Sequence, residues 1–116
     1  MQELVKIAKA ISDETRIRML KLLMEKDICV CEMEEIFHLS SSQLSRNCKM
    51  LMEAGFLKRW REGKCVLYIA DRNNQNQYCQ TILNMVAESF NDSELTRRDR
   101  DSLQQVINDQ IREKRK

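Results

Sequence analysis

Apolar residues recur every three or four positions through most of the chain, which is the spacing of helices that bury one face. This spacing predicts a helix over 3–11 and a second helix from Ser12 or Asp13 to about Glu25, because small polar residues cap helix starts well. A third amphipathic stretch indicates a helix that begins at Cys31. The first part of the chain is therefore expected to be helical.

The spacing changes between the second and third predicted helices, where Ile28 and Val30 alternate with Cys29 and Cys31. Alternation predicts a short extended segment, in which every second side chain points the same way. On one regular helix, two cysteines that are two positions apart would point about 200° away from each other. The extended entry instead allows both thiols to face one side.

Helical spacing resumes over 41–54, with Ser40 or Ser41 as the candidate N-cap and Gly55 as the stop, since glycine suits a left-handed C-cap. Two short strands are predicted within 56–70, joined at a glycine-containing hairpin turn.

The last part of the chain predicts two further helices, over 77–90 and over about 94–113, the second of them highly charged. The chain contains no proline and only two glycines, so β structure is expected only near those glycines. We therefore expect one domain over 1–116 that is mainly α with a small β-hairpin. The order of helix, turn, helix and hairpin is that of a winged helix-turn-helix.

Charge becomes informative only when it is mapped along the chain. Residues 41–64 carry six positive side chains against two negative ones, although the whole chain has a net charge of only +2. A basic helix followed by a basic hairpin favours binding of double-stranded DNA, with helix 41–54 in the major groove. The expected contact residues are Ser41, Ser42, Gln43, Ser45, Arg46, Lys49, Arg59, Arg61 and Lys64.

A single unit of this kind contacts few bases, so we expect a homodimer on a palindromic site. Helices 3–11 and 77–90 have wide apolar faces and are the candidate dimer surfaces, unless those faces only close the monomer core. No membrane partner, small organic substrate or permanently bound cofactor is expected. With no leader or membrane span, a cytoplasmic location is expected, where the five cysteines would be reduced.

Five motifs together resemble the ArsR/SmtB family of metalloregulatory repressors. They are "DETR", "ICVCEM", "LSSSQLSR", "LMEAGFL" and "REGKCVLY". The resemblance covers about residues 4–70, and it implies a homodimeric winged-helix repressor that leaves its operator when an inducer binds. It is strongest toward the arsenical-resistance repressors, whose As(III)/Sb(III) site the segment at Cys29 and Cys31 resembles.

The identity of the inducer and of a third ligand stays open in the sequence. Cd(II), Pb(II) and Zn(II) are alternative ions, because thiolates bind all of them. Arsenical repressors have a third cysteine where this chain has Glu34, which is a candidate ligand or else a helix-capping residue. Cys48, on the inward face of helix 41–54, is a second candidate ligand or else a core residue. Cys65 and Cys79 are expected to be packing residues.

Two other functions remain as alternatives. The thiol pair could be a redox or persulfide switch in a repressor of the same fold, although a disulfide between Cys29 and Cys31 would form a strained small ring. A thiol enzyme ranks last, because the pair has no neighbouring histidine and the chain has no glycine-built substrate loop.

Overall fold

The computed structural model describes residues 1–114 and is mainly helical with one small antiparallel sheet. Its elements are α1 (Gln2–Ala10), α2 (Glu14–Leu23), β1 (Ile28–Cys29), α3 (Val30–Phe37), α4 (Ser41–Ala54), β2 (Leu57–Glu62), β3 (Cys65–Ala70), α5 (Gln77–Glu88), α6 (Glu94–Asn108) and α7 (Ile111–Lys114). The order matches the predicted winged helix-turn-helix, and the predicted helix boundaries before Gly55 agree within one or two residues.

The three strands are ordered β1-β3-β2, with both pairs antiparallel. The hairpin of β2 and β3 turns at Gly63 and Lys64, where Gly63 has a φ of +59° that favours glycine. The predicted extended segment is confirmed only for Ile28 and Cys29, which form β1 with Cys29 opposite Leu67 of β3, whereas Val30 and Cys31 already belong to α3. The hairpin of β2 and β3 is the wing of the fold, and the sheet thus attaches it to the start of α3.

Polar caps fix where the longer helices begin. Asp13 accepts a hydrogen bond from the backbone N–H of Arg16 at 3.1 Å, and Ser93 accepts one from Thr96 at 3.2 Å. Each cap satisfies an amide that has no partner within its helix. α4 ends at Ala54 and is capped by Gly55, whose φ of +100° suits a residue without a Cβ.

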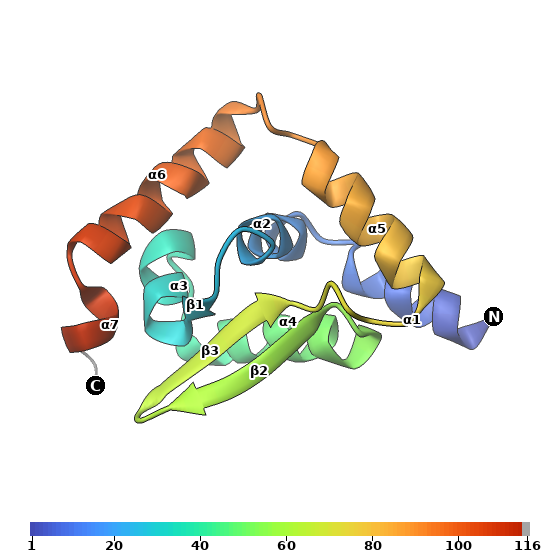
Figure 1. Ribbon diagram of the computed structural model, residues 1–116, viewed down its shortest axis with the longest axis horizontal. Coiled ribbons are helices and arrows are strands. Elements are labelled where there is room, and N and C mark those ends of the chain that lie inside the picture. The colour runs from blue at the N-terminus through green and yellow to red at the C-terminus, as the bar shows by residue number, and fades with distance from the viewer. Residues whose placement is uncertain (115–116) are drawn as a thin grey trace.

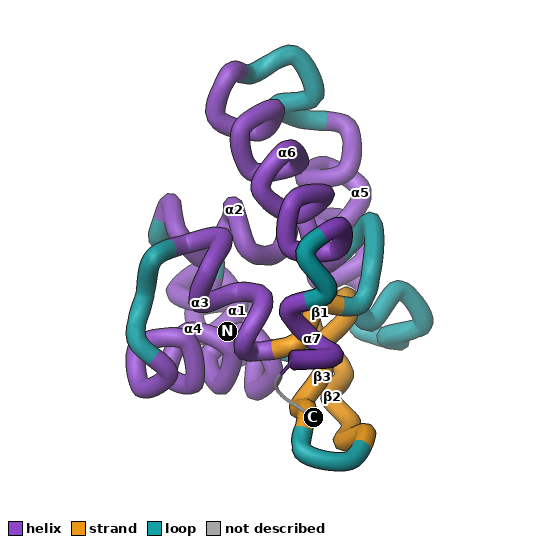
Figure 2. The backbone as a smooth tube through the Cα atoms, turned by 90° about the vertical axis from the view of Figure 1, so that its left-hand side faces the viewer, coloured by secondary structure: helices purple, strands orange, loops and turns teal. Residues whose placement is uncertain are grey.

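The core lies where α2 meets the surrounding helices and the sheet. In Figure 1, α5 and α6 form an inverted V over α2 and α3, and the hairpin lies on the opposite side. Figure 2 shows the tip of that hairpin projecting beyond the helices. The largest fully buried side chains are Phe56, Ile7, Met19, Leu20, Leu22, Leu23, Ile28, Met33, Leu44, Leu51, Leu67 and Leu83.

The predicted single helix over 94–113 is wrong. α6 ends at Asn108, Gln110 takes a left-handed φ of 54°, and α7 begins at Ile111. A left-handed residue reverses the local path of the chain, so α7 turns away from the axis of α6. The predicted helix 77–90 is also shorter, because α5 ends at Glu88.

The third helix begins one residue earlier than predicted, at Val30, with Cys29 as its N-cap. The capping carboxylate is consequently Glu32, whose Oε1 accepts a hydrogen bond from the backbone N–H of Cys29 at 2.8 Å. The capping role that the sequence suggested for Glu34 therefore belongs to Glu32, which is three residues after the observed N-cap.

Candidate DNA-binding surface and thiol site

The helix that is predicted to enter the major groove, the recognition helix, is α4. Its buried face sets its orientation. Leu44, Cys48 and Leu51 are completely buried against the rest of the molecule. At its start, the Ser40 hydroxyl accepts a hydrogen bond from the N–H of Gln43, and the Gln43 side chain accepts one from the N–H of Ser40. This reciprocal capping box holds the first turn of α4.

The outer face of α4 and the hairpin form one exposed polar surface. Figure 1 shows the hairpin beside α4. All the predicted DNA-contacting side chains are exposed, namely Ser41, Ser42, Gln43, Ser45, Arg46, Lys49, Arg59, Arg61 and Lys64. One of them is partly committed, because Oε1 of Gln43 is held by the cap, which leaves its amide N–H₂ to donate.

Arg16 of α2 positions α4 and was not predicted from the sequence. Its Nη1 donates to Oδ1 of Asn47 at 3.1 Å, and its Nε donates to the carbonyl of Ala10 at 2.7 Å. The guanidinium therefore joins the end of α1 to the middle of α4. The motif "DETR" contained Arg16, but nothing in the spacing indicated that Asn47 is its partner.

The thiols of Cys29 and Cys31 lie together, in the arrangement that the alternating pattern predicts. Their Sγ atoms are 3.1 Å apart at the start of α3, and both side chains are buried. Burial raises the pKa of Cys31 to about 12, with further contributions from Cys29, Cys65 and Glu32. The Cys31 thiol therefore carries its proton near neutral pH.

A third cysteine joins this pair. Cys65 of β3 is buried in the same small cluster as Cys29, Cys31 and Leu67. Cys48 belongs instead to the main core, where burial raises the pKa of its thiol to about 12. Within residues 1–114, no three His, Cys, Asp or Glu side chains are already arranged closely enough to hold a metal ion. The structure thus places Cys65, and not Cys48, with the pair.

The thiol cluster opens into a cavity of about 340 Å³ that also reaches the predicted DNA-binding surface. One part of its lining contains the three cysteines and the half-buried Glu34, and another part contains predicted DNA contacts. Those contacts are Ser41, Ser45, Arg59 and Lys64. The same cavity is therefore bordered by the candidate inducer site and by the candidate DNA site.

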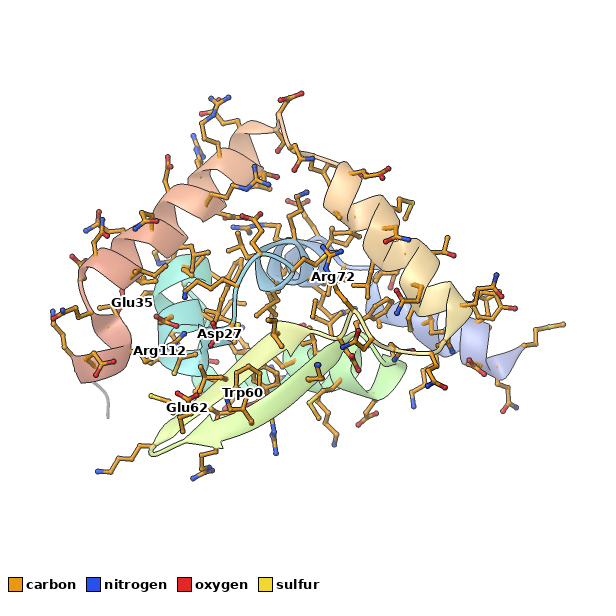
Figure 3. The ribbon with its side chains drawn as sticks, in the orientation of Figure 1. Asp27, Glu35, Trp60, Glu62, Arg72 and Arg112 are labelled. Atoms are coloured by element: carbon orange, nitrogen blue, oxygen red, sulfur yellow. The ribbon has the colours of Figure 1, made fainter. Side chains whose placement is uncertain are left out.

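On another side, the C-terminal segment closes over the thiol cluster. Ile111 packs against the cluster, and Nη2 of Arg112 lies 2.8 Å from the buried carboxylate of Glu32. Arg112 also forms an ion pair with Asp27 at 3.5 Å, and Figure 3 shows these two side chains beside each other. This contact spans about eighty residues of sequence and was not predicted.

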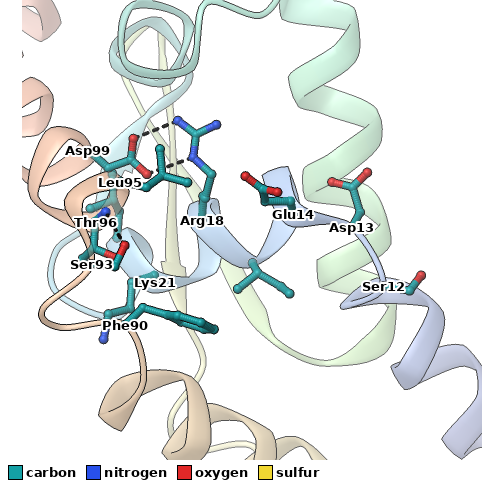
Figure 4. A pocket seen from close by; sticks show the side chains of 12 residues that line it. Ser12, Asp13, Glu14, Arg18, Lys21, Phe90, Ser93, Leu95, Thr96 and Asp99 are labelled. Atoms are coloured by element: carbon teal, nitrogen blue, oxygen red, sulfur yellow. Dashed lines mark hydrogen bonds and ion pairs between the residues drawn. The ribbon is translucent and has the colours of Figure 1, made fainter.

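A larger cavity of about 470 Å³ lies between α2 and the start of α6, as Figure 4 shows. Its polar lining includes the ion pair of Arg18 with Asp99, at 2.8 Å, and the side chain of Lys21. Its lining contains no cysteine. It is thus separate from the thiol site.

Comparison with known proteins agrees with the fold. Residues 13–59 match the family model described as bacterial regulatory protein, arsR family. Over these residues the chain resembles that family. The matched segment contains α2, the thiol pair, α3 and α4.

Two curated relatives are metal-resistance regulators by name. The chain is 33% identical over 76 residues to the cadmium resistance transcriptional regulatory protein CadC homolog of Staphylococcus aureus, covering 65% of this chain and 63% of that protein. It is 40% identical over 63 residues to the arsenic resistance transcriptional regulator ArsR1 of Pseudomonas putida, covering 53% and 49%. The chain spans about half to two thirds of the length of these relatives. Both names describe transcriptional regulators.

Solved structures share the fold. One is the homodimeric winged helix-turn-helix DNA-binding domain of Mb0332 from Mycobacterium bovis, with a TM-score of 0.63 and 17% identity over 80% of this chain and 82% of that one. That likeness supports the winged-helix assignment. Within residues 1–114, no helix has the length and apolar character needed to cross a bilayer.

Proposed function

We propose that this chain is a DNA-binding transcriptional repressor that releases its operator when a thiophilic metal or metalloid binds Cys29 and Cys31. The observation that carries the proposal is the shared cavity. It is lined both by the thiol pair and by Ser41, Ser45 and Arg59 of the basic surface. An ion that draws the thiols together acts at the base of the surface that contacts DNA.

The proposed contact with DNA depends on the positive charge of the exposed side chains and on their length. Arg46 projects from the exposed face of α4 and is long enough to reach base edges in a major groove. Arg59, Arg61 and Lys64 of the exposed hairpin are placed to contact phosphates, which orient a protein on the duplex without reading its sequence.

Exposed apolar side chains on α1, on α5 and just after α5 support a homodimer. They are Leu4, Val5, Tyr78, Met85 and Phe90, each at least 43% exposed. Tyr78 and Met85 are exposed on α5, and Phe90 is exposed just after its end, whereas the monomer core takes Cys79, Leu83 and Val86. A second copy of the chain would cover the outer face and pair two recognition helices on a palindromic site.

The inducer that we favour is As(III) or Sb(III), since buried thiols bind soft ions more readily than oxygen ligands do. Cd(II), Pb(II) and Zn(II) are the alternatives, and the names of the relatives include both cadmium and arsenic. Because an inducer that binds the DNA-free state more tightly weakens DNA binding by the same factor, either kind of ion would cause release.

The test is a DNA-binding titration with duplexes that the protein itself selects from a random pool. Arsenite, antimonite, Cd(II), Zn(II) and peroxide are added separately to the complex, and release is followed by fluorescence anisotropy. We expect release by arsenite or antimonite in the wild type, and none in Cys29→Ser or Cys31→Ser. Release that is unchanged in both variants would remove the pair from the sensor, and absence of DNA binding at low salt would overturn the repressor assignment.

A second candidate is a thiol-redox or persulfide switch in the same repressor. The separation of 3.1 Å between the Sγ atoms of Cys29 and Cys31 favours it, because oxidised thiols bond to near neighbours. Release by peroxide that a thiol reductant reverses, with no response to any of the ions, would select this alternative.

A further inference from the structure

We propose that Cys65 of the wing supplies the third sulfur of the inducer site, so that Cys29, Cys31 and Cys65 together bind one As(III) or Sb(III). This inference rests on the proposed function and adds a specific ligand to it. The three residues are the only cysteines of their cluster, and all three line the same cavity. Each of them is at most 7% exposed.

The strand register explains why Cys65 lies there. Cys29 of β1 pairs with Leu67 of β3 in an antiparallel ladder. Side chains alternate along a strand, so Cys65 is on the same face as Leu67 and is a diagonal neighbour of Cys29. If the same register continued past β1, Cys31 would stand opposite Cys65, although the chain there turns into α3.

The chemistry of the donors also selects Cys65 over Glu34. Three soft sulfur donors suit a thiophilic ion, whereas the oxygens of Glu34 are hard donors. Cys65 already interacts with its surroundings, since its Sγ lies 3.8 Å from the carbonyl oxygen of Arg112. Because no three ligands in residues 1–114 are arranged closely enough for an ion, the cysteine side chains must close up on binding.

The reaction balances without an oxidant or a reductant. Arsenous acid, As(OH)₃, loses three hydroxyl groups while the three thiols lose three protons, which leave together as three water molecules. Three As–S bonds form, and arsenic keeps its +3 state throughout. Phenylarsine oxide has one phenyl group bonded to arsenic and therefore takes only two thiols, with the loss of one water molecule.

The position of Cys65 connects an ion directly to the wing. Cys65 pairs with Glu62 across the turn at Gly63 and Lys64. Lys64, its neighbour in the chain, lines the same cavity and is one of the proposed phosphate contacts. Binding of an ion that pulls Cys65 toward the start of α3 therefore moves the tip of the hairpin relative to α4. Because the hairpin and α4 must fit the same DNA duplex, this movement weakens DNA binding.

The test compares two arsenic compounds on the full chain, with native mass spectrometry and DNA release as independent measurements. Wild type should gain one arsenic and lose three hydrogens with arsenite. Cys65→Ser should instead keep a hydroxyl on arsenic and lose two hydrogens, and its arsenite affinity should be at least about tenfold weaker. Cys79→Ser, which removes a buried cysteine of the main core, is the matched control and should behave as wild type.

Phenylarsine oxide shows whether the pair itself is intact in the variant, since it needs only Cys29 and Cys31. It should bind wild type and Cys65→Ser equally. Glu34→Gln should leave the response to arsenite unchanged. A Cys65→Ser variant that binds arsenite as tightly as wild type, or a loss of three-coordinate binding in Glu34→Gln instead, overturns the proposal. Either result leaves inducer-dependent release through Cys29 and Cys31 intact. Three-sulfur binding without DNA release would instead overturn the proposed function and keep the site.

Discussion

The molecule contains two kinds of buried cysteine, and the contrast between them separates packing from chemistry. Cys48 and Cys79 lie in the main core, where apolar side chains surround them. Cys29, Cys31 and Cys65 are equally hidden, but they lie beside one another and line a cavity. Burial raises the pKa of both Cys48 and Cys31 to about 12, so protonation state does not distinguish these two thiols. What differs is whether a second sulfur is within reach.

Neighbouring sulfurs change what a buried thiol can do. An isolated thiol in a core acts as a small hydrophobic side chain. Several thiols at one cavity offer an ion enough ligands to offset the loss of its water, and that gain is available only in the folded protein.

Removing one sulfur of the pair should abolish inducer-dependent release, whereas removing a core sulfur should not. When two ligands are coupled, one typically changes the affinity for the other about 5- to 150-fold. In Cys29→Ser, arsenite should leave the affinity for DNA unchanged, which is a factor of one. Cys79→Ser should retain the wild-type factor. The measurement is the affinity for a DNA duplex with and without saturating arsenite. Equal coupling in the two variants would erase the contrast between the groups.

The free energy of unfolding should fall more when a cysteine of the main core is replaced than when a cysteine of the thiol cluster is replaced. Cys48→Ser puts a hydroxyl into the completely buried inner face of α4, and a buried polar group without a partner costs about 1–3 kcal/mol. In Cys65→Ser the hydroxyl can donate to the carbonyl of Arg112, near which the thiol already lies. Urea unfolding should therefore show a larger loss for Cys48→Ser. A larger loss for Cys65→Ser would contradict the assignment of Cys48 to packing.

High pH should weaken the fold through the same core thiol. The pKa of Cys48 is raised to about 12 in the folded protein, so between about pH 9 and pH 12 the unfolded chain loses this proton first. The contribution of Cys48 is complete below pH 9 and falls by up to about 1.4 kcal/mol per pH unit above it. Cys48→Ala should show a shallower decline in urea-unfolding free energy over this range. An identical slope would mean that Cys48 ionises freely.

The sequence predicted the helices and the thiol pair because those features are local. Helical spacing and the caps at Asp13 and Gly55 depend on residues within a few positions of one another. The alternation at Cys29 and Cys31 is equally local, and it predicted that both thiols face one side.

Contacts between distant segments could not be read in this way. Cys65 reaches the pair only because β1 pairs with β3 in one particular register, which no spacing reveals. Arg112 reaches Glu32 because the helix breaks at Gln110, although neither glycine nor proline marks the break and the apolar seam of Leu103 and Ile111 continues through it. The third sulfur and the segment that covers it are therefore properties of the fold.

The smallest predicted effect concerns Lys64, which lies in the turn at the tip of the wing and also lines the thiol cavity. Each neutralised phosphate contributes to the dependence of DNA affinity on salt, because binding releases counterions. Lys64→Ala should weaken binding to all duplexes alike and reduce the slope of log affinity against log salt by about 1. Arg98→Ala is the control, since Arg98 is an exposed cation on α6, away from the hairpin (Figure 1). Equal slopes in the Lys64→Ala variant and the wild type would show that the wing tip does not touch the phosphates. An ion held by Cys65 would then have to act on DNA through α3 and α4 alone.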